Sequence, residues 1–253
     1  MKRLLEASGA VLFAAGLLLL WQILAERELI SPVFFPSPSR TLGELWHQVV
    51  QGLIWAPLVA TGYRMFCGWA LASLAGAAVG AAIGLSRAAR EYLEPLLEFL
   101  RPLPASAVVP VAILFLGFSN AMTIAVIAFG AIWPVLLGSL HGFVSIEPQL
   151  ADVAAALKLT RAQAFAKIAV PNALPDILAG ARVGLAISLI LAVVTEMQAS
   201  QTGLGQNILL AQRSFRSPEL YAGVVTLGIV GFAINHAIVV LERRLLRWRG
   251  APA

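Results

Sequence analysis

Charged residues are scarce in this chain. Only 12% of its 253 residues are Asp, Glu, Lys or Arg, against roughly 25% in average soluble domains. A soluble fold of this length could not cover its surface with so few charges, so the composition indicates an integral membrane protein instead. The single cysteine, Cys67, excludes an intrachain disulfide.

Recognisable signatures of catalysis and of nucleotide or metal binding are missing as well. No G-x-x-x-x-G-K-[ST] phosphate loop occurs, so we expect that this chain does not itself bind ATP. The spacing of His47, His141 and His236 suits no metal site. No nucleophile–base arrangement is visible either. We therefore expect no catalytic residue, no metal and no cofactor bound by the chain.

Long apolar runs are what the sequence has instead. A span needs roughly 20 apolar residues, and six runs are candidates: residues 5–24, 58–85, 103–118, 122–140, 177–197 and 221–241. The third is short and contains Pro104 and Pro110, so we expect a broken helix packed inside the bundle. The first has an apolar core too long for a signal peptide and no cleavage site after it, so we expect it to be retained. The predicted fold class is an all-α membrane protein with about six transmembrane helices.

Basic residues flank these runs, as topology signals do, rather than clustering on a soluble face that could bind nucleic acid. If both termini are inside, four basic residues fall outside: Arg27, Arg40, Arg213 and Arg216. Twelve fall inside: Lys2, Arg3, Arg87, Arg90, Arg101, Lys158, Arg161, Lys167, Arg243, Arg244, Arg247 and Arg249. The positive-inside rule therefore predicts cytoplasmic N- and C-termini.

Small residues recur every fourth position in two of the runs. The second carries Gly68, Ala72, Gly76, Gly80 and Gly84, and the fifth carries Gly180, Gly184, Ser188 and Ala192. Small residues at this spacing let helix backbones approach closely in lipid. We expect tight helix packing at these positions, with direct pore lining as the alternative.

Two outer connections carry further signals. Residues 26–57 begin proline-rich, and Ser39 is expected to cap a short interfacial helix over 40–51. The second connection, residues 198–219, begins at Gln198 and holds Gly203 and Gly205 before a predicted short helix.

A segment of a different kind, residues 151–175, separates the fourth and fifth runs. A first helix is expected to begin at Pro148. Thr160 with Gln163 fits a capping box for a second helix, which we expect Pro171 to halt. One face of this second helix is apolar and carries Phe165, with basic residues off it. The residues alone fit a cytoplasmic helix–turn–helix and a helix lying on the bilayer equally well.

Ionisable residues within the runs are candidate functional residues. Arg64 and Glu196 both fall in the outer part of their spans, where they either pair with each other or extend outward separately. Arg182 is expected to extend towards the cytoplasm. Asn235 and His236 suit hydrogen bonding between helices.

The segment 151–175 resembles the EAA loop of ABC-importer permeases, in which Glu-Ala-Ala, three residues, Gly and a later Pro form the coupling helices. Asp152 stands here where Glu is usual, and Lys158 where Gly is usual, so the turn cannot rely on the tolerance of glycine for positive φ. The resemblance implies contacts with an ATPase subunit from Asp152, Ala154, Lys158, Arg161, Phe165, Lys167, Ile168 and Pro171.

Several longer stretches are similar to the nitrate, sulfonate and taurine branch of these permeases. They include "LISPVFFPSPSRTLGELW", "GLSRAAREYLEPLLEFLRPLPASAVVPVAILFLGF" and "PNALPDILAGARVGLAISLILAVVTEMQAS". The resemblance implies a non-enzymatic permease subunit in a prokaryotic inner membrane that imports a small anion. Its implied partners are a second permease subunit, two ATPase subunits that hold ATP and Mg, and an extracytoplasmic binding protein.

We expect an N-terminal helix with its outer connection over 1–57, a permease core over 58–241 with a coupling loop at 145–175, and a basic cytoplasmic tail over 242–253. The candidates for the translocation path or its gate are Arg64, Glu196, Gln198, Gly203 and Gly205.

The same machinery could instead import a vitamin precursor. Two other classes are an ion-coupled secondary transporter, for which inverted repeats and charged relays are not visible, and a purely structural anchor, which the broken third run disfavours.

Overall fold

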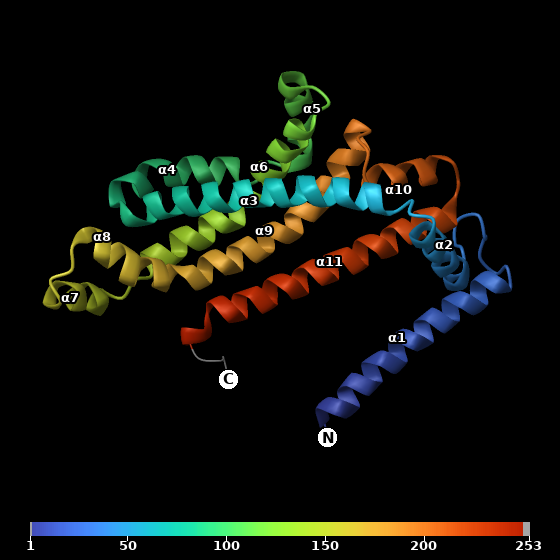
Figure 1. Cartoon of the computed structure of the whole chain (residues 1–253), viewed down its shortest axis with the longest axis horizontal. Helices are drawn as coiled ribbons and strands as arrows, with labels where there is room; N and C mark the ends of the chain where they lie inside the picture. Colours follow the sequence, from blue (N-terminus) through green and yellow to red (C-terminus); the bar gives the residue numbers. More distant parts are fainter. Residues whose placement is uncertain (1, 250–253) are drawn as a thin grey trace. The chain divides into compact units, whose positions relative to one another are not determined.

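The computed structural model describes residues 2–249, and every regular element in that range is a helix (Figure 1). The elements are α1 Lys2–Glu26, α2 Pro38–Val50, α3 Trp55–Leu85, α4 Arg87–Leu100, α5 Ala105–Leu116, α6 Asn120–Val144, α7 Pro148–Ala156, α8 Arg161–Ala164, the π-helical turn η1 Phe165–Ala169, α9 Val170–Ala199, α10 Leu204–Arg213, α11 Ser217–Leu245 and the 3₁₀ turn η2 Arg247–Arg249. The predicted all-α class is confirmed.

The chain divides into two compact units. Unit 1 comprises Met1–Val59 and Thr202–Val230, and unit 2 comprises Ala60–Gln201 and Gly231–Ala253. The N-terminal region is thus grouped with α10 and the first half of α11. The expected boundaries at 57/58 and 241/242 stay predictions, and residues 250–253 of the expected tail lie outside the described residues.

Four of the described helices are long and apolar enough to cross a membrane: α3, α6, the continuous helix Arg161–Ala199, and α11. The pair α4 and α5 adds a fifth if it counts as one bent span, and the apolar part of α1, Leu12–Glu26, is shorter. The count of six spans therefore stays a prediction.

The helix break expected for the third span, 103–118, lies at the start of that span, next to Pro104. Helices α4 and α5 meet at an angle of 93°, and the break lies at residues 101–104, which include Pro102 and Pro104. Pro110 lies inside α5 without ending it. Helix α4 was not predicted from the sequence, although Ser86 caps it by accepting a hydrogen bond from the backbone N–H of Ala89 at 3.2 Å.

The short helix of the first outer connection, α2, begins two residues earlier than expected. Its N-cap is Ser37, whose hydroxyl accepts from the N–H of Arg40, and Pro38 occupies the first turn. The cap predicted at Ser39 is wrong, because Pro38 suits the first helical position and moves the cap to the residue before it. Ser39 instead accepts a hydrogen bond from Gln22 of α1 at 2.8 Å.

Helix α6 is central to unit 2 and packs closely against α3 and α9. A Cβ atom added at Gly80 of α3 would lie 2.5 Å from Leu136 O and 2.6 Å from Ser139 Cβ of α6. The remaining glycines predicted to pack, Gly68, Gly76, Gly84, Gly180 and Gly184, likewise face α6. The helices thus approach closely at these positions, as the packing prediction requires, because only the absence of a side chain admits such distances.

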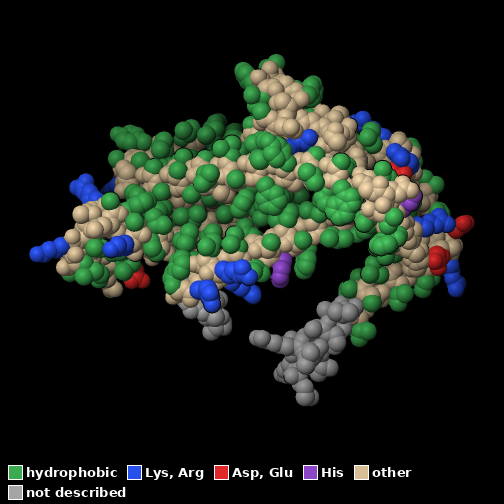
Figure 2. Space-filling model, in the orientation of Figure 1, with side chains coloured by type: hydrophobic (Ala, Val, Ile, Leu, Met, Phe, Trp, Pro, Cys, Tyr) green, Lys and Arg blue, Asp and Glu red, His purple; other side chains and the backbone are tan. Residues whose placement is uncertain are grey.

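Figure 2 shows hydrophobic side chains covering the long helices of unit 2. Lysine and arginine side chains gather at the end of that unit that carries α7 and α8 (Figure 2). An apolar flank with basic residues at one end is typical of a helix bundle in a bilayer.

A pair of single-methyl substitutions within α3 tests this packing. Gly80→Ala should lower the free energy of unfolding by about 1–3 kcal/mol, the usual range for overpacking. Gly62→Ala is the matched control, since nothing lies within 4 Å of a Cβ added there, and it should be neutral or slightly stabilising. Thermal unfolding of the purified chain in detergent measures both. Equal melting temperatures for the two variants would contradict the close crossing.

Candidate functional site

An ion pair lies in the interior of unit 2, between α3 and α9. Arg64 Nη1 of α3 is 2.8 Å from Glu196 Oε1 of α9, and the two side chains are only 8% and 0% exposed. Of the two alternatives predicted from the sequence, pairing is therefore the observed one. A buried carboxylate or guanidinium without a partner would cost several kcal/mol, which explains why the two charges meet.

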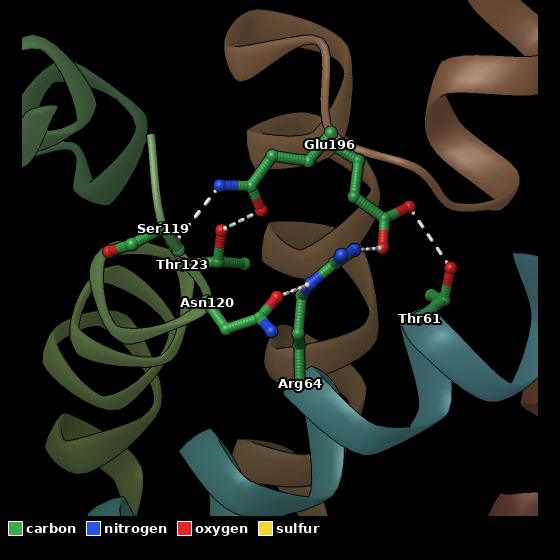
Figure 3. A network of polar contacts seen from close by, with 7 residues as sticks. Thr61, Arg64, Ser119, Asn120, Thr123 and Glu196 are labelled. Atoms are coloured by element: carbon green, nitrogen blue, oxygen red, sulfur yellow. Dashed lines mark hydrogen bonds and ion pairs between the residues drawn. The ribbon is translucent and has the colours of Figure 1, made fainter. Parts of the chain in front are cut away.

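Neighbouring polar side chains complete the hydrogen bonding of this pair (Figure 3). The Thr61 hydroxyl donates to Glu196 Oε2 at 3.0 Å. The Arg64 Nε–H donates to Asn120 Oδ1 at 2.7 Å. Asn120 is the first residue of α6, so the network joins α3, α6 and α9 at a single end of the bundle.

A second set of bonds extends the network from α6 to the chain that follows α9. The Thr123 hydroxyl donates to Gln201 Oε1 at 2.7 Å, and Gln201 Nε2–H donates to the Ser119 carbonyl oxygen at 2.9 Å. Ser119 is also the N-cap of α6. Sequence reasoning missed Thr61, Asn120, Thr123 and Gln201, because single uncharged polar residues near helix ends carry no distinctive pattern.

The cytoplasmic segment predicted from the sequence begins with α7, whose C-terminus is closed by Lys158. The N–H groups of Lys158 and Leu159 donate to the carbonyl oxygens of Ala155 and Ala154, both at 3.0 Å. This is the Schellman arrangement, in which the residue after the C-cap is left-handed. Lys158 has φ +48°, so it adopts the conformation that glycine usually occupies.

The second helix of this segment begins at the predicted capping box. Thr160 accepts from the N–H of Gln163 at 3.3 Å, and Gln163 Oε1 accepts from the N–H of Thr160 at 3.0 Å. The expected stop at Pro171 is wrong, because α8 continues through η1 into α9 as one helix from Arg161 to Ala199. Pro171 lies in the first turn of α9, where its missing N–H costs little after the π-helical turn.

The residues expected to contact an ATPase differ in their exposure. Asp152, Lys158, Arg161 and Lys167 are exposed, and Ala154, Ile168 and Pro171 are half-buried. Phe165 is 41% exposed, and its ring stacks on Phe143 of α6 with ring centroids 5.8 Å apart. Phe165 is therefore partly held by its own chain, and only its outer part remains available to a partner.

The remaining candidates lie in separate places. Gln198 is exposed in the last turn of α9. Gly203 and Gly205 belong to unit 1, where Gly203 is the N-cap of α10 and both are buried. Their predicted part in a path or gate stays a prediction. Among residues 2–249, no group of three or more His, Cys, Asp or Glu side chains could hold a metal ion.

Arg182 contacts α11 within unit 2, and its expected extension towards the cytoplasm stays a prediction. Its Nε–H donates to Asn235 Oδ1 at 3.3 Å, and its Nη1 lies 3.8 Å from Glu242 Oε2. Asn235 thus makes the hydrogen bond between helices that the sequence predicted. The pair Arg182–Glu242 is partly exposed, so its contribution to stability is modest.

Comparisons with known proteins point to membrane transport. The model of the family described as "Binding-protein-dependent transport system inner membrane component" matches residues 72–249. A Bacillus subtilis (strain 168) permease protein named for aliphatic sulfonates transport is 31% identical over 95% of this chain and 87% of its own length. The taurine transport system permease protein of Escherichia coli is 32% identical over 93% of this chain and 88% of its own.

Two further similarities concern nitrate import and the fold. The nitrate import permease protein of Leptolyngbya laminosa is 28% identical over 91% of this chain and 84% of its own. A solved structure of the MetNI methionine ABC transporter in inward-facing conformations has a TM-score of 0.66 at 18% identity. It covers 78% of this chain and 98% of the matched chain. At that identity the likeness shows the fold alone.

The buried ion pair can be tested by a double-mutant cycle. Arg64→Gln leaves Glu196 buried without its charge partner and should lower the free energy of unfolding by about 3–5 kcal/mol, as should Glu196→Gln. The double variant should regain much of this loss. Thermal unfolding in detergent measures the cycle.

The matched control is the exposed pair Arg87 and Glu91 of α4, which lie 2.9 Å apart with side chains 92% and 62% exposed. The same cycle there should give a coupling of less than about 1 kcal/mol. Single variants of Arg64 and Glu196 that unfold at the wild-type temperature would rule out a stabilising pair.

Proposed function

Because this chain belongs to the family of binding-protein-dependent transport system inner membrane components, we propose that it forms the path for a small anion in an ATP-driven importer. The observation that carries the proposal is the match of the family model over residues 72–249, together with relatives aligned over more than nine-tenths of the chain. Permeases with this role are transport subunits, so the chain is not an enzyme.

The proposed assembly contains two copies of this chain, two ATPase subunits that hold ATP and Mg, and an extracytoplasmic binding protein. The ATPase subunits would dock on the segment that contains α7, α8 and η1. Two features support this docking site. The segment is rich in exposed basic side chains, and it continues without a break into α9. In this proposal the segment lies in the cytoplasm, with both chain termini on the same side of the membrane.

The continuous helix Arg161–Ala199 suggests how a partner could act on the path. Glu196 lies near one end of this helix, and the proposed ATPase contact lies at the other. A displacement of the coupling segment would therefore be transmitted along one continuous helix to the Arg64–Glu196 pair. We propose that this pair belongs to the outer gate, because it holds three helices together at one end of the bundle.

A sulfonate, taurine or a nitrate-like ion is the proposed cargo. The supporting observation is that relatives of this chain are named for aliphatic sulfonates, taurine and nitrate. A rival proposal, from a different class, is an ion-coupled secondary transporter. The continuous coupling helix with its exposed basic segment favours the ATP-driven machine, because a secondary transporter needs no such docking element.

Reconstitution distinguishes these two classes. The chain is co-purified with its ATPase and placed in proteoliposomes with the loaded binding protein on one side. We expect uptake of taurine, an alkanesulfonate or nitrate that requires ATP and the binding protein, measured by mass spectrometry of the vesicle contents. Uptake driven by an ion gradient in the absence of the ATPase would contradict the proposal.

The ATPase contact is tested through Phe165. Phe165→Ala removes an aromatic ring that is 41% exposed in the proposed contact, and interfaces favour aromatic residues. We expect the amount of ATPase that co-purifies with the permease to fall at least tenfold. Phe118→Ala is the control, because Phe118 is 71% exposed but lies between α5 and α6, away from this segment. If ATPase is retained equally by both variants, Phe165 is not part of the contact.

A further inference from the structure

A cavity of about 350 Å³ opens between α5, α6 and α9 in unit 2. Nine residues line it, and Arg101 is the single charged one among them. The volume lies at the lower end of the range for small-molecule sites, roughly 300–1,000 Å³. Such sites are mostly apolar with a few polar groups that orient the ligand, and this cavity has that composition.

Arg101 lies level with the middle of the bundle, although the sequence placed it in a cytoplasmic segment. It shares the cavity wall with Gly130 and Trp133, which are central in α6, and with Ile187 and Leu191 of α9. The sequence-based placement failed because helix α4, Arg87–Leu100, follows the end of α3. Arg101 therefore lies one helix length away from that end. Ionisable residues at such depth usually face a cavity inside the bundle and are candidates for function, and Arg101 is an exposed residue on a cavity wall.

Among the side chains that the structure describes, none forms an ion pair or hydrogen bond with the Arg101 guanidinium. Arg101 is exposed, whereas Arg64 is buried in unit 2 and bound to Glu196 and Asn120. The charge of Arg64 is neutralised by a carboxylate of the protein. The positive charge of Arg101 has no such partner and can bind an anionic ligand. A guanidinium is suited to forked hydrogen bonds with an oxyanion.

The helix break at Arg101 is a second indication. Helices α4 and α5 meet there at 93°, and irregular backbone at membrane depth occurs where it is buried in protein or lines a cavity. In transporters, discontinuous helices of this kind commonly form the substrate site. Here the break, the unpaired guanidinium and the cavity coincide.

We propose that this cavity is a transport-path site for an alkanesulfonate, with the sulfonate on Arg101 and the alkyl chain against the apolar wall. The proposal rests on the proposed importer function and narrows its substrate class. Nitrate has no apolar part to bury, whereas each buried methylene group would strengthen binding roughly fourfold. The site should therefore favour alkanesulfonates over nitrate.

The test uses the complete importer in proteoliposomes at saturating loaded binding protein. Uptake of ethanesulfonate and butanesulfonate by each variant is divided by wild-type uptake of the same compound, which cancels the preference of the binding protein. Arg101→Gln should lower uptake of both at least tenfold, with ATP hydrolysis kept within twofold. Arg87→Gln, the exposed arginine of α4, should transport normally.

A second variant probes the apolar wall. Leu137→Trp fills part of the cavity and should lower uptake of butanesulfonate at least threefold more than uptake of ethanesulfonate. If Arg101→Gln does not assemble, Arg101→Lys replaces it. That variant keeps the positive charge but loses the paired hydrogen bonds that a guanidinium forms with an oxyanion. It should lower uptake of both compounds at least threefold.

Uptake by a folded Arg101 variant within twofold of wild type would overturn the proposal. An equal loss of both sulfonates in Leu137→Trp would overturn the placement of the alkyl chain. A wild-type complex that transports taurine or nitrate but neither alkanesulfonate would overturn this inference and leave the proposed function standing. A wild-type complex that transports none of these compounds would contradict the proposed function itself.

Discussion

The packing of unit 2 depends on backbone-to-backbone approach at α6. Glycines of α3 and α9 face it, and at Gly80 even one added carbon would overlap Leu136 and Ser139. In lipid, where the hydrophobic effect does not drive helices together, such close approach supplies the van der Waals contact that holds them. The polar network and the central cavity are both built on these crossings.

The Arg64–Glu196 network and the coupling segment lie towards opposite ends of one helix. The segment from Arg161 to Ala199 is continuous through η1, so the proposed ATPase contact and the ion pair lie on a single continuous helix. Further hydrogen bonds support the pair, with Thr61 on one oxygen of Glu196 and Asn120 on Arg64. A gate of this kind would open only when an outside force offsets the cost of separating two buried charges.

Helices α4 and α5 contrast with that continuous helix. They break near the middle of the bundle and bring Arg101 to a mostly apolar cavity. One side of unit 2 thus contains an element suited to transmit motion, and another contains an irregular element suited to hold a ligand. A permease needs both properties, and in this chain different helices supply them.

Composition and local pattern were enough to predict an all-α membrane protein, the small-residue packing faces and the Thr160–Gln163 capping box, because these depend on residues close together in the chain. Lys158 shows the limit of that reasoning. Its left-handed conformation follows from the closing bonds of α7, although the residue type alone argued against it.

Pairings over long separations were decided by the tertiary structure alone. Arg64 and Glu196 are 132 residues apart, and the sequence could not choose between their pairing and their separate extension to solvent. The tertiary structure also determined the depth of Arg101 in the bundle, because that depth depends on the direction in which α4 runs after α3. The sequence determined which segments are apolar helices, since that depends on local composition, whereas the partner of each buried charge depends on which helices cross.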